Sequence, residues 1–152
     1  MRRFTYAVVS LSIVLSAALA LAHEEGHGPK ITDSGKQGGI VSPVVDAKDA
    51  SKGEKAALVY KSELVRSEDG TVRIYLYDSA MNAIDVTQLS PEAKGILSFK
   101  KKKKWTHATF VLKQAEGAYV GKAPKAEAKP FNIDVKIKEG SRELLTAFDN
   151  LD

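Results

Sequence analysis

Residues 71–78 form the stretch TVRIYLYD, and this stretch decides the fold class. Val72, Ile74 and Leu76 share one face of an extended chain, while the residues between them point the other way. β-branched and aromatic side chains dominate, as is typical of strands. Asp69-Gly70 comes directly before and is a strong hairpin signal. The stretch therefore predicts a strand of an antiparallel sheet.

Similar short patterns recur along the chain. Ser42-Pro43 limits the first to an edge strand, because proline cannot donate to a ladder. Ser90-Pro91 predicts one helical turn, with Ser90 as its N-cap. We find no long amphipathic helix after the first 22 residues. The predicted strands cover residues 40–45, 57–65, 71–78, 96–99, 105–113, 119–120 and 131–137, and residues 144–148 form either a last strand or a terminal turn. They predict an all-β domain over residues 38–152, an immunoglobulin-like antiparallel β-sandwich or, alternatively, a small β-barrel.

The first 22 residues have the organisation of a signal peptide. Arg2 and Arg3 precede an apolar run over residues 6–21, which ends at Ala20-Leu21-Ala22. This run is shorter than the roughly 20 residues of a membrane-spanning helix. We therefore expect cleavage after Ala22, no stable membrane span after cleavage, and a bacterial periplasmic or secreted protein. Residues 23–37 are rich in charge and glycine and predict a flexible tail.

Composition excludes several classes of function. The chain has no cysteine, which excludes a lipoprotein, disulfides, thiolate metal sites and cysteine nucleophiles. Without Arg2 and Arg3, the 23 basic side chains fall to 21 against 19 acidic ones, a net charge of +2. This near balance, together with the expected compartment, argues against a nucleic-acid partner.

Several motifs resemble those of a family of small exported bacterial β-sandwich proteins. Gly38-Gly39, Glu63-Leu64-Val65, the stretch over residues 69–78 and Gly95-Ile96-Leu97 follow that family's layout across residues 38–138. The resemblance implies a periplasmic β-sandwich associated with heavy-metal efflux or copper handling. Relatives often carry a histidine near the two glycines and another before the ELV segment. This chain has Gln37 and Tyr60-Lys61-Ser62 there, so a metal site within the domain is in doubt.

The three histidines are the candidate metal ligands. Cleavage after Ala22 would make His23 the mature N-terminus, where its α-amino group and imidazole could chelate Cu(II). This resembles the copper sites of periplasmic copper-resistance proteins and lytic polysaccharide monooxygenases. His27 or His107 could supply a third nitrogen. The first hypothesis is a non-enzymatic copper carrier near a metal-efflux or other envelope protein; the alternatives are weak adventitious binding and, for His107, an ordinary strand residue.

A lysine run gives the second hypothesis. Lys100, Lys101, Lys102, Lys103 and Lys104 are followed directly by Trp105, an amphipathic anchor. We expect the lysines in a hairpin loop, where they could bind anionic lipid head groups, lipopolysaccharide or a glycan, or could simply be solvated and discourage edge pairing. The chain would then be a metal-free envelope interaction module, using this loop and the sheet surface. Asp78 and Asp85 fall in expected turns, and we assign no catalytic residue.

Overall fold

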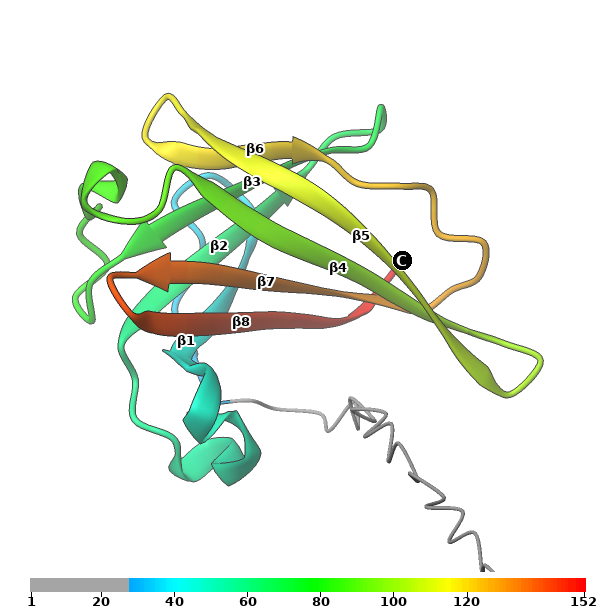
Figure 1. The fold of residues 1–152 in the computed structure, drawn as a ribbon, viewed down its shortest axis with the longest axis horizontal. Coiled ribbons are helices and arrows are strands. Elements are labelled where there is room, and N and C mark those ends of the chain that lie inside the picture. Colours follow the sequence, from blue (N-terminus) through cyan, green and yellow to red (C-terminus); the bar gives the residue numbers. More distant parts are fainter. Residues whose placement is uncertain (1–27) are drawn as a thin grey trace, which may run out of the picture.

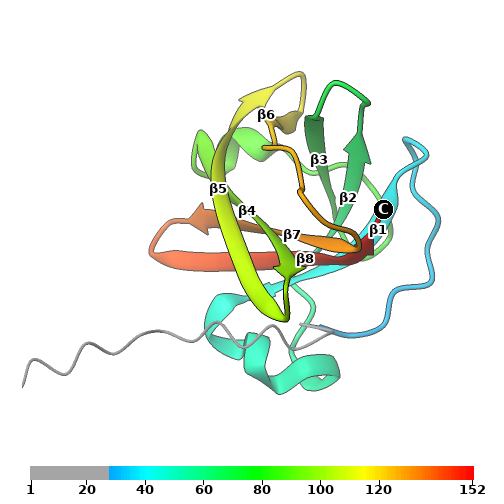
Figure 2. The same cartoon turned by 90° about the vertical axis from the view of Figure 1, so that its right-hand side faces the viewer.

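Eight antiparallel strands form a closed barrel in the computed structural model, which describes residues 28–152 (Figures 1 and 2). The order around the barrel is β1-β2-β3-β6-β5-β4-β7-β8, and β8 pairs with β1 to close it. The strands are β1 (Ile40–Asp46), β2 (Tyr60–Arg66), β3 (Thr71–Tyr77), β4 (Glu92–Lys101), β5 (Lys104–Ala115), β6 (Ala118–Lys122), β7 (Phe131–Glu139) and β8 (Arg142–Leu151).

The all-β prediction is confirmed, and the barrel alternative describes the architecture. The immunoglobulin-like sandwich is not formed. A sandwich needs two sheets with separate edges, whereas here β6 joins β3 to β5, and β8 joins β7 to β1. The predicted signal peptide, His23 and His27 lie outside the described residues. Within residues 28–152, no helix is long and apolar enough to span a membrane.

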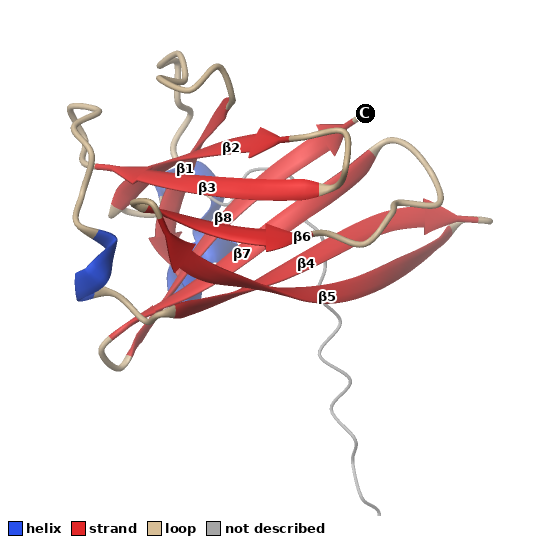
Figure 3. Ribbon diagram, turned by 90° about the horizontal axis from the view of Figure 1, so that it is seen from above, coloured by secondary structure: helices blue, strands red, loops and turns tan. Residues whose placement is uncertain are grey.

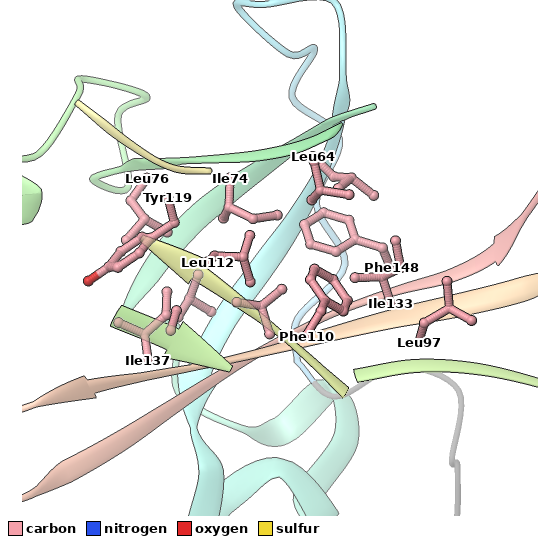
Figure 4. Packing of buried hydrophobic residues seen from close by; sticks show 14 of the residues in the cluster. Leu64, Ile74, Leu76, Leu97, Phe110, Leu112, Tyr119, Ile133, Ile137 and Phe148 are labelled. Atoms are coloured by element: carbon pink, nitrogen blue, oxygen red, sulfur yellow. The ribbon is translucent and has the colours of Figure 1, made fainter. Parts of the chain in front are cut away.

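The alternation in β3 fills the barrel as the sequence predicts. Val72, Ile74 and Leu76 are each at most 2% exposed and point into the bore. They meet inward-facing residues from the other strands in one hydrophobic core. Figure 4 shows this core extending from Tyr119 and Ile137 towards Leu97 and Phe148. A bore filled by side chains is usual for eight strands.

β1 is an edge strand over only half its length, which corrects the prediction. Residues 40–44 pair with β2, but pairing with β8 begins at Val44, one residue after Pro43. The proline therefore occupies a position that donates to no strand on the β8 side. Ser42 replaces part of that pairing by donating from its hydroxyl to the carbonyl of Ala147. The closed ring then incorporates the second half of β1.

The helical turn predicted at Ser90 is wrong. The backbone of this segment is hydrogen-bonded to neighbouring strands instead. The N–H of Ser90 donates to the carbonyl of Lys138, and the carbonyl of Pro91 accepts from the N–H of Gln114. Two short 3₁₀ helices lie elsewhere, η1 (Ala47–Lys55) and η2 (Val86–Gln88) (Figure 3). Val86 and Leu89 from the η2 segment belong to the core and cover that end of the bore.

The opposite end of the barrel carries a projecting hairpin. The pairing of β4 with β7 stops at Phe99 and Phe131, whereas β4 and β5 remain paired to Lys101 and Lys104. The tip therefore extends beyond the neighbouring strand β7, as Figures 1 and 3 show. The β2–β3 turn, the β6–β7 connection and the end of β8 lie at this same end, which we call the basic end.

Candidate functional site

His107 lies on the exposed outer face of β5, opposite Ser98 of β4. Its ring nitrogen Nδ1 is 2.7 Å from the hydroxyl oxygen of Ser98, which is itself buried. The ring stacks on Trp105, with centroids 6.4 Å apart and planes inclined by 16°. One of the two nitrogens that could bind a metal is thus engaged by a hydroxyl.

The described residues hold no group of three or more His, Asp or Glu side chains arranged to bind a metal ion. Of the candidate ligands His23, His27 and His107, the structure places only the last. A copper site made with the N-terminal histidines stays a prediction, because those residues lie outside residues 28–152.

The five lysines lie at the hairpin tip, as the sequence predicts, and they are divided between the ends of two strands and the turn that joins them. Lys100 and Lys101 end β4, Lys104 begins β5, and Lys102 and Lys103 form the two-residue turn. The turn residues have φ values of 48° and 67°. Positive φ at both positions is the requirement of a type I′ hairpin turn, which normally takes Asn-Gly. Lysine here accepts an uncommon backbone conformation.

The hairpin places a cation directly over an aromatic ring. Lys100 and Trp105 are cross-strand partners, and the ammonium of Lys100 lies 5.3 Å from the centroid of the indole ring. The indole is 40% exposed. Lys101 forms an ion pair with Glu127 of the β6–β7 connection. The tip therefore combines exposed positive charge with a large amphipathic ring.

A cavity of about 530 Å³ opens at the basic end. Its floor is made by core residues Val72, Leu97, Phe131 and Ile133. The β6–β7 connection, residues 123–130, forms one wall. Mouths of β-barrels are frequent ligand sites, and this volume lies within the usual range of roughly 300–1,000 Å³.

Basic side chains outnumber acidic ones around this end. Beyond the hairpin, Arg66, Lys125 and Lys129 line the cavity, together with the acidic Glu68 and Asp152. The guanidinium of Arg66 lies 4.9 Å from the centroid of the Phe131 ring and donates to the backbone carbonyl of Asp152 at 2.9 Å. The cavity and the hairpin thus belong to one positively charged region.

A buried carboxylate that the sequence analysis missed holds the chain before β1 against the barrel. Glu63 points outward from β2 and is 0% exposed. Its Oε1 accepts from the N–H groups of Gln37 and Gly39, and its Oε2 accepts from Lys36 N–H and the Tyr77 hydroxyl, at 2.7–2.9 Å. The sequence offered one signal, an acidic residue in the middle of a predicted strand, directly before Leu64 and Val65.

The charge state of Glu63 follows from these donors. Burial favours the protonated acid, but the N–H groups and the Tyr77 hydroxyl outweigh it, so the pKa of Glu63 lies below its usual value. Burial and the neighbouring carboxylate raise the pKa of Tyr77. A second contact anchors the same segment, because Lys61 forms an ion pair with Asp33 at 2.7 Å. Both interactions are structural anchors within residues 33–39, part of which had been predicted as tail.

Asp78 and Asp85 have the local roles that their turn positions predict. The carboxylate of Asp78 accepts from the N–H groups of Ala80 and Asn82, and that of Asp85 caps η2 through the N–H of Thr87. Hydrogen bonds from Asn82 and Thr87 lower the pKa of Asp78 and Asp85 respectively.

Comparisons with protein-family models, curated proteins and solved structures find no significant match to this chain. The resemblance to exported β-sandwich proteins, and what it implies about copper handling, therefore stays a prediction. The residues that the structure itself brings together are the hairpin lysines, Trp105 and the cavity beside them.

Proposed function

We propose that the mature chain is a non-enzymatic binding module of the bacterial periplasm, whose basic end docks onto an anionic lipid surface. The observation that supports this most strongly is the projection of the lysine hairpin past β7. A projecting tip can approach a flat surface without collision from the rest of the barrel. The expected export signal supports the compartment.

The charges of the tip suit an anionic surface. Each lysine near such a surface contributes about 1 kcal/mol, and the attraction fades within a Debye length of about 10 Å at 0.1 M salt. Lys100, Lys102, Lys103 and Lys104 have no acidic ion-pair partner within residues 28–152, whereas Lys101 is paired with Glu127. Their charge is therefore available to phosphate groups.

Trp105 provides the apolar component of this contact. Indole rings favour the boundary between lipid chains and head groups, since they present an apolar body and a polar N–H. Trp105 is partly exposed and lies beside the lysines on the same hairpin. Aromatic and cationic groups together bind such surfaces more strongly than lysines alone.

Vesicle co-sedimentation tests this proposal with a variant that keeps the hairpin intact. Lys102→Asn and Lys103→Gly suit the positive φ values of the turn, and Lys100, Lys101 and Lys104 are each changed to Gln. The matched control removes five exposed lysines elsewhere by changing each to Gln: Lys48, Lys52, Lys55, Lys113 and Lys138.

The vesicles contain equal parts of phosphatidylglycerol and phosphatidylcholine, with pure phosphatidylcholine as the neutral comparison. We expect the hairpin variant to bind the anionic vesicles at least about a hundredfold more weakly than the wild type, because it lacks several surface cations. The control should lose much less. Equal losses of affinity in the two variants would contradict the proposal, because vesicle binding would then depend on the net charge of the protein and not on the hairpin.

The copper function remains a second proposal, independent of the hairpin. It rests on His23 becoming the mature N-terminus, with His27 or His107 as a further ligand. Native mass spectrometry of protein exported and processed in a bacterial periplasm, with one equivalent of Cu(II) and a competing chelator, tests it. Retained copper that is lost when His23 and His27 are changed to alanine supports a carrier role, whereas unchanged binding in that double variant contradicts it.

A further inference from the structure

We propose that the cavity at the basic end binds the acyl chain of a single-chain amphiphile with a monoanionic head group, a fatty acid being the simplest example. This goes beyond surface docking, because it assigns a ligand site at the mouth of the barrel, between the core and the β6–β7 connection. It shares the basic end with the proposed function but does not depend on it.

The floor of the cavity is suited to a hydrocarbon chain. Val72, Leu97, Phe131 and Ile133 are 1–6% exposed and contribute only apolar side-chain atoms. A polar metabolite would lose its hydration there without gaining hydrogen bonds. A hydrocarbon chain has no such penalty and gains from each methylene removed from water.

The wall over this floor is a surface connection, and small residues face inward from it. Ala123, Ala126 and Ala128 of the β6–β7 connection are partly buried and pack against the core. The connection is fastened at one end, where Ala123 N–H donates to the carbonyl of Gly70 at 3.0 Å. The ion pair between Lys101 and Glu127 fastens its middle to the hairpin. Because these side chains are small, they do not fill the cavity, while the backbone of the connection forms its wall.

The rim selects the charge of the head group. Arg66, Lys125 and Lys129 can pair with a carboxylate, and Arg66 already lies over the Phe131 ring, where floor and rim meet. Glu68 and Asp152 line the same cavity and repel additional negative charge. A single carboxylate therefore fits this rim better than a doubly charged phosphate monoester.

Direct titration with a dansyl-labelled undecanoate, followed by displacement with unlabelled palmitate, tests the site. Ala126→Trp puts an indole into the cavity from the surface connection, and Ala57→Trp adds the same ring to an exposed loop as a control. Arg66→Gln removes the cation at the rim, and Arg73→Gln is its control on the outer face of β3. All four are measured in solution, without vesicles.

We expect saturable binding by the wild type and both controls. Ala126→Trp should abolish it, and Arg66→Gln should weaken it about tenfold, the usual effect of losing one charged hydrogen bond. The methyl ester of the probe should bind the wild type about tenfold more weakly than the acid does. Arg66→Gln should bind the ester with the same affinity as the wild type binds it, because the ester has no carboxylate for Arg66 to pair with.

Absence of saturable binding, or binding unchanged in Ala126→Trp, would overturn the proposal. If Ala126→Trp does not fold, Arg66→Gln and the ester decide the question, because equal affinity for acid and ester excludes the assigned rim. A second hairpin variant that keeps Lys101, and with it the ion pair to Glu127, but changes the other four lysines should retain full affinity for the probe. Ala126→Trp should retain vesicle binding. Vesicle binding thus tests the docking proposal and probe binding tests the cavity proposal, so that either one can fail while the other holds.

Discussion

The carboxylate of Glu63 lies 2.7 Å from the hydroxyl of Tyr77, and both side chains are buried on the outer surface of the barrel. Three backbone N–H groups complete the coordination of this carboxylate. A charged group buried with this many donors gains stability from every one of them, and removing the charge leaves a donor unsatisfied.

Replacing Glu63 by Gln should lower the free energy of unfolding by about 2 kcal/mol, because an amide offers one acceptor oxygen in place of two. Urea denaturation followed by circular dichroism measures this. Glu68→Gln, in the exposed β2–β3 turn, is the control and should change stability by less than about 0.5 kcal/mol. Equal effects at the two positions would mean that the Glu63 contacts contribute nothing specific.

The same carboxylate predicts a pH dependence. The folded-state pKa of Glu63 lies below its usual value of 4.5, so folding favours the ionised form. Its contribution to stability is complete above the unfolded pKa and disappears as the pH falls through the folded pKa. The stability difference between wild type and Glu63→Gln should therefore shrink as the pH falls below 4.5. A difference that grows with acidity would contradict this assignment.

Gly95 should tolerate no side chain. It pairs with Phe110 across β4 and β5, and a Cβ at Gly95 would collide with the Phe110 ring. Gly95→Ala should destabilise the barrel by about 1–3 kcal/mol through overpacking. Adding Phe110→Leu should recover part of that loss, so the two substitutions should be non-additive when measured by denaturation. Strict additivity would show that the ring does not cover the glycine in solution.

The hairpin turn makes the opposite prediction, a gain in stability. Lys102→Asn with Lys103→Gly places the residues preferred at positive φ in a type I′ turn. We expect the melting temperature to rise, with a gain of about 0.5–1 kcal/mol, because lysine is strained at these dihedral angles. The reciprocal pair Lys102→Val and Lys103→Val should destabilise, since β-branched residues resist positive φ. A neutral result for both pairs would indicate a different turn.

Local patterns predicted the strands well because they depend on neighbouring residues. The alternation of β3 and β7 and the lysine turn of the β4–β5 hairpin are visible in the sequence. The preference for a sandwich over a barrel was wrong, because closure depends on the pairing of β8 with β1, which joins segments about 100 residues apart. A sandwich and a barrel use the same alternating strands, so local patterns do not separate them. The helical turn at Ser90 failed because tertiary hydrogen bonds overrode its local signals.

The candidate site was predicted in part. The lysines and Trp105 are consecutive, so their proximity could be predicted without knowing the fold. Arg66 and Lys129 are far apart in the sequence and come together at the cavity only in the closed barrel. Glu63 was missed because its partners are mainly backbone N–H groups, which carry no residue signature. His107 was found as a candidate ligand, but its contact with Ser98 depends on the strand register.

The emission of Trp105 on addition of anionic vesicles tests the central claim most directly. It is the only tryptophan in the chain, so its fluorescence reports the hairpin alone. We predict a blue shift with vesicles containing phosphatidylglycerol, quenching by lipids brominated near the head group, reversal at high salt, and no response to pure phosphatidylcholine. An emission spectrum unchanged by the anionic vesicles, with the protein folded, would contradict docking through the basic end.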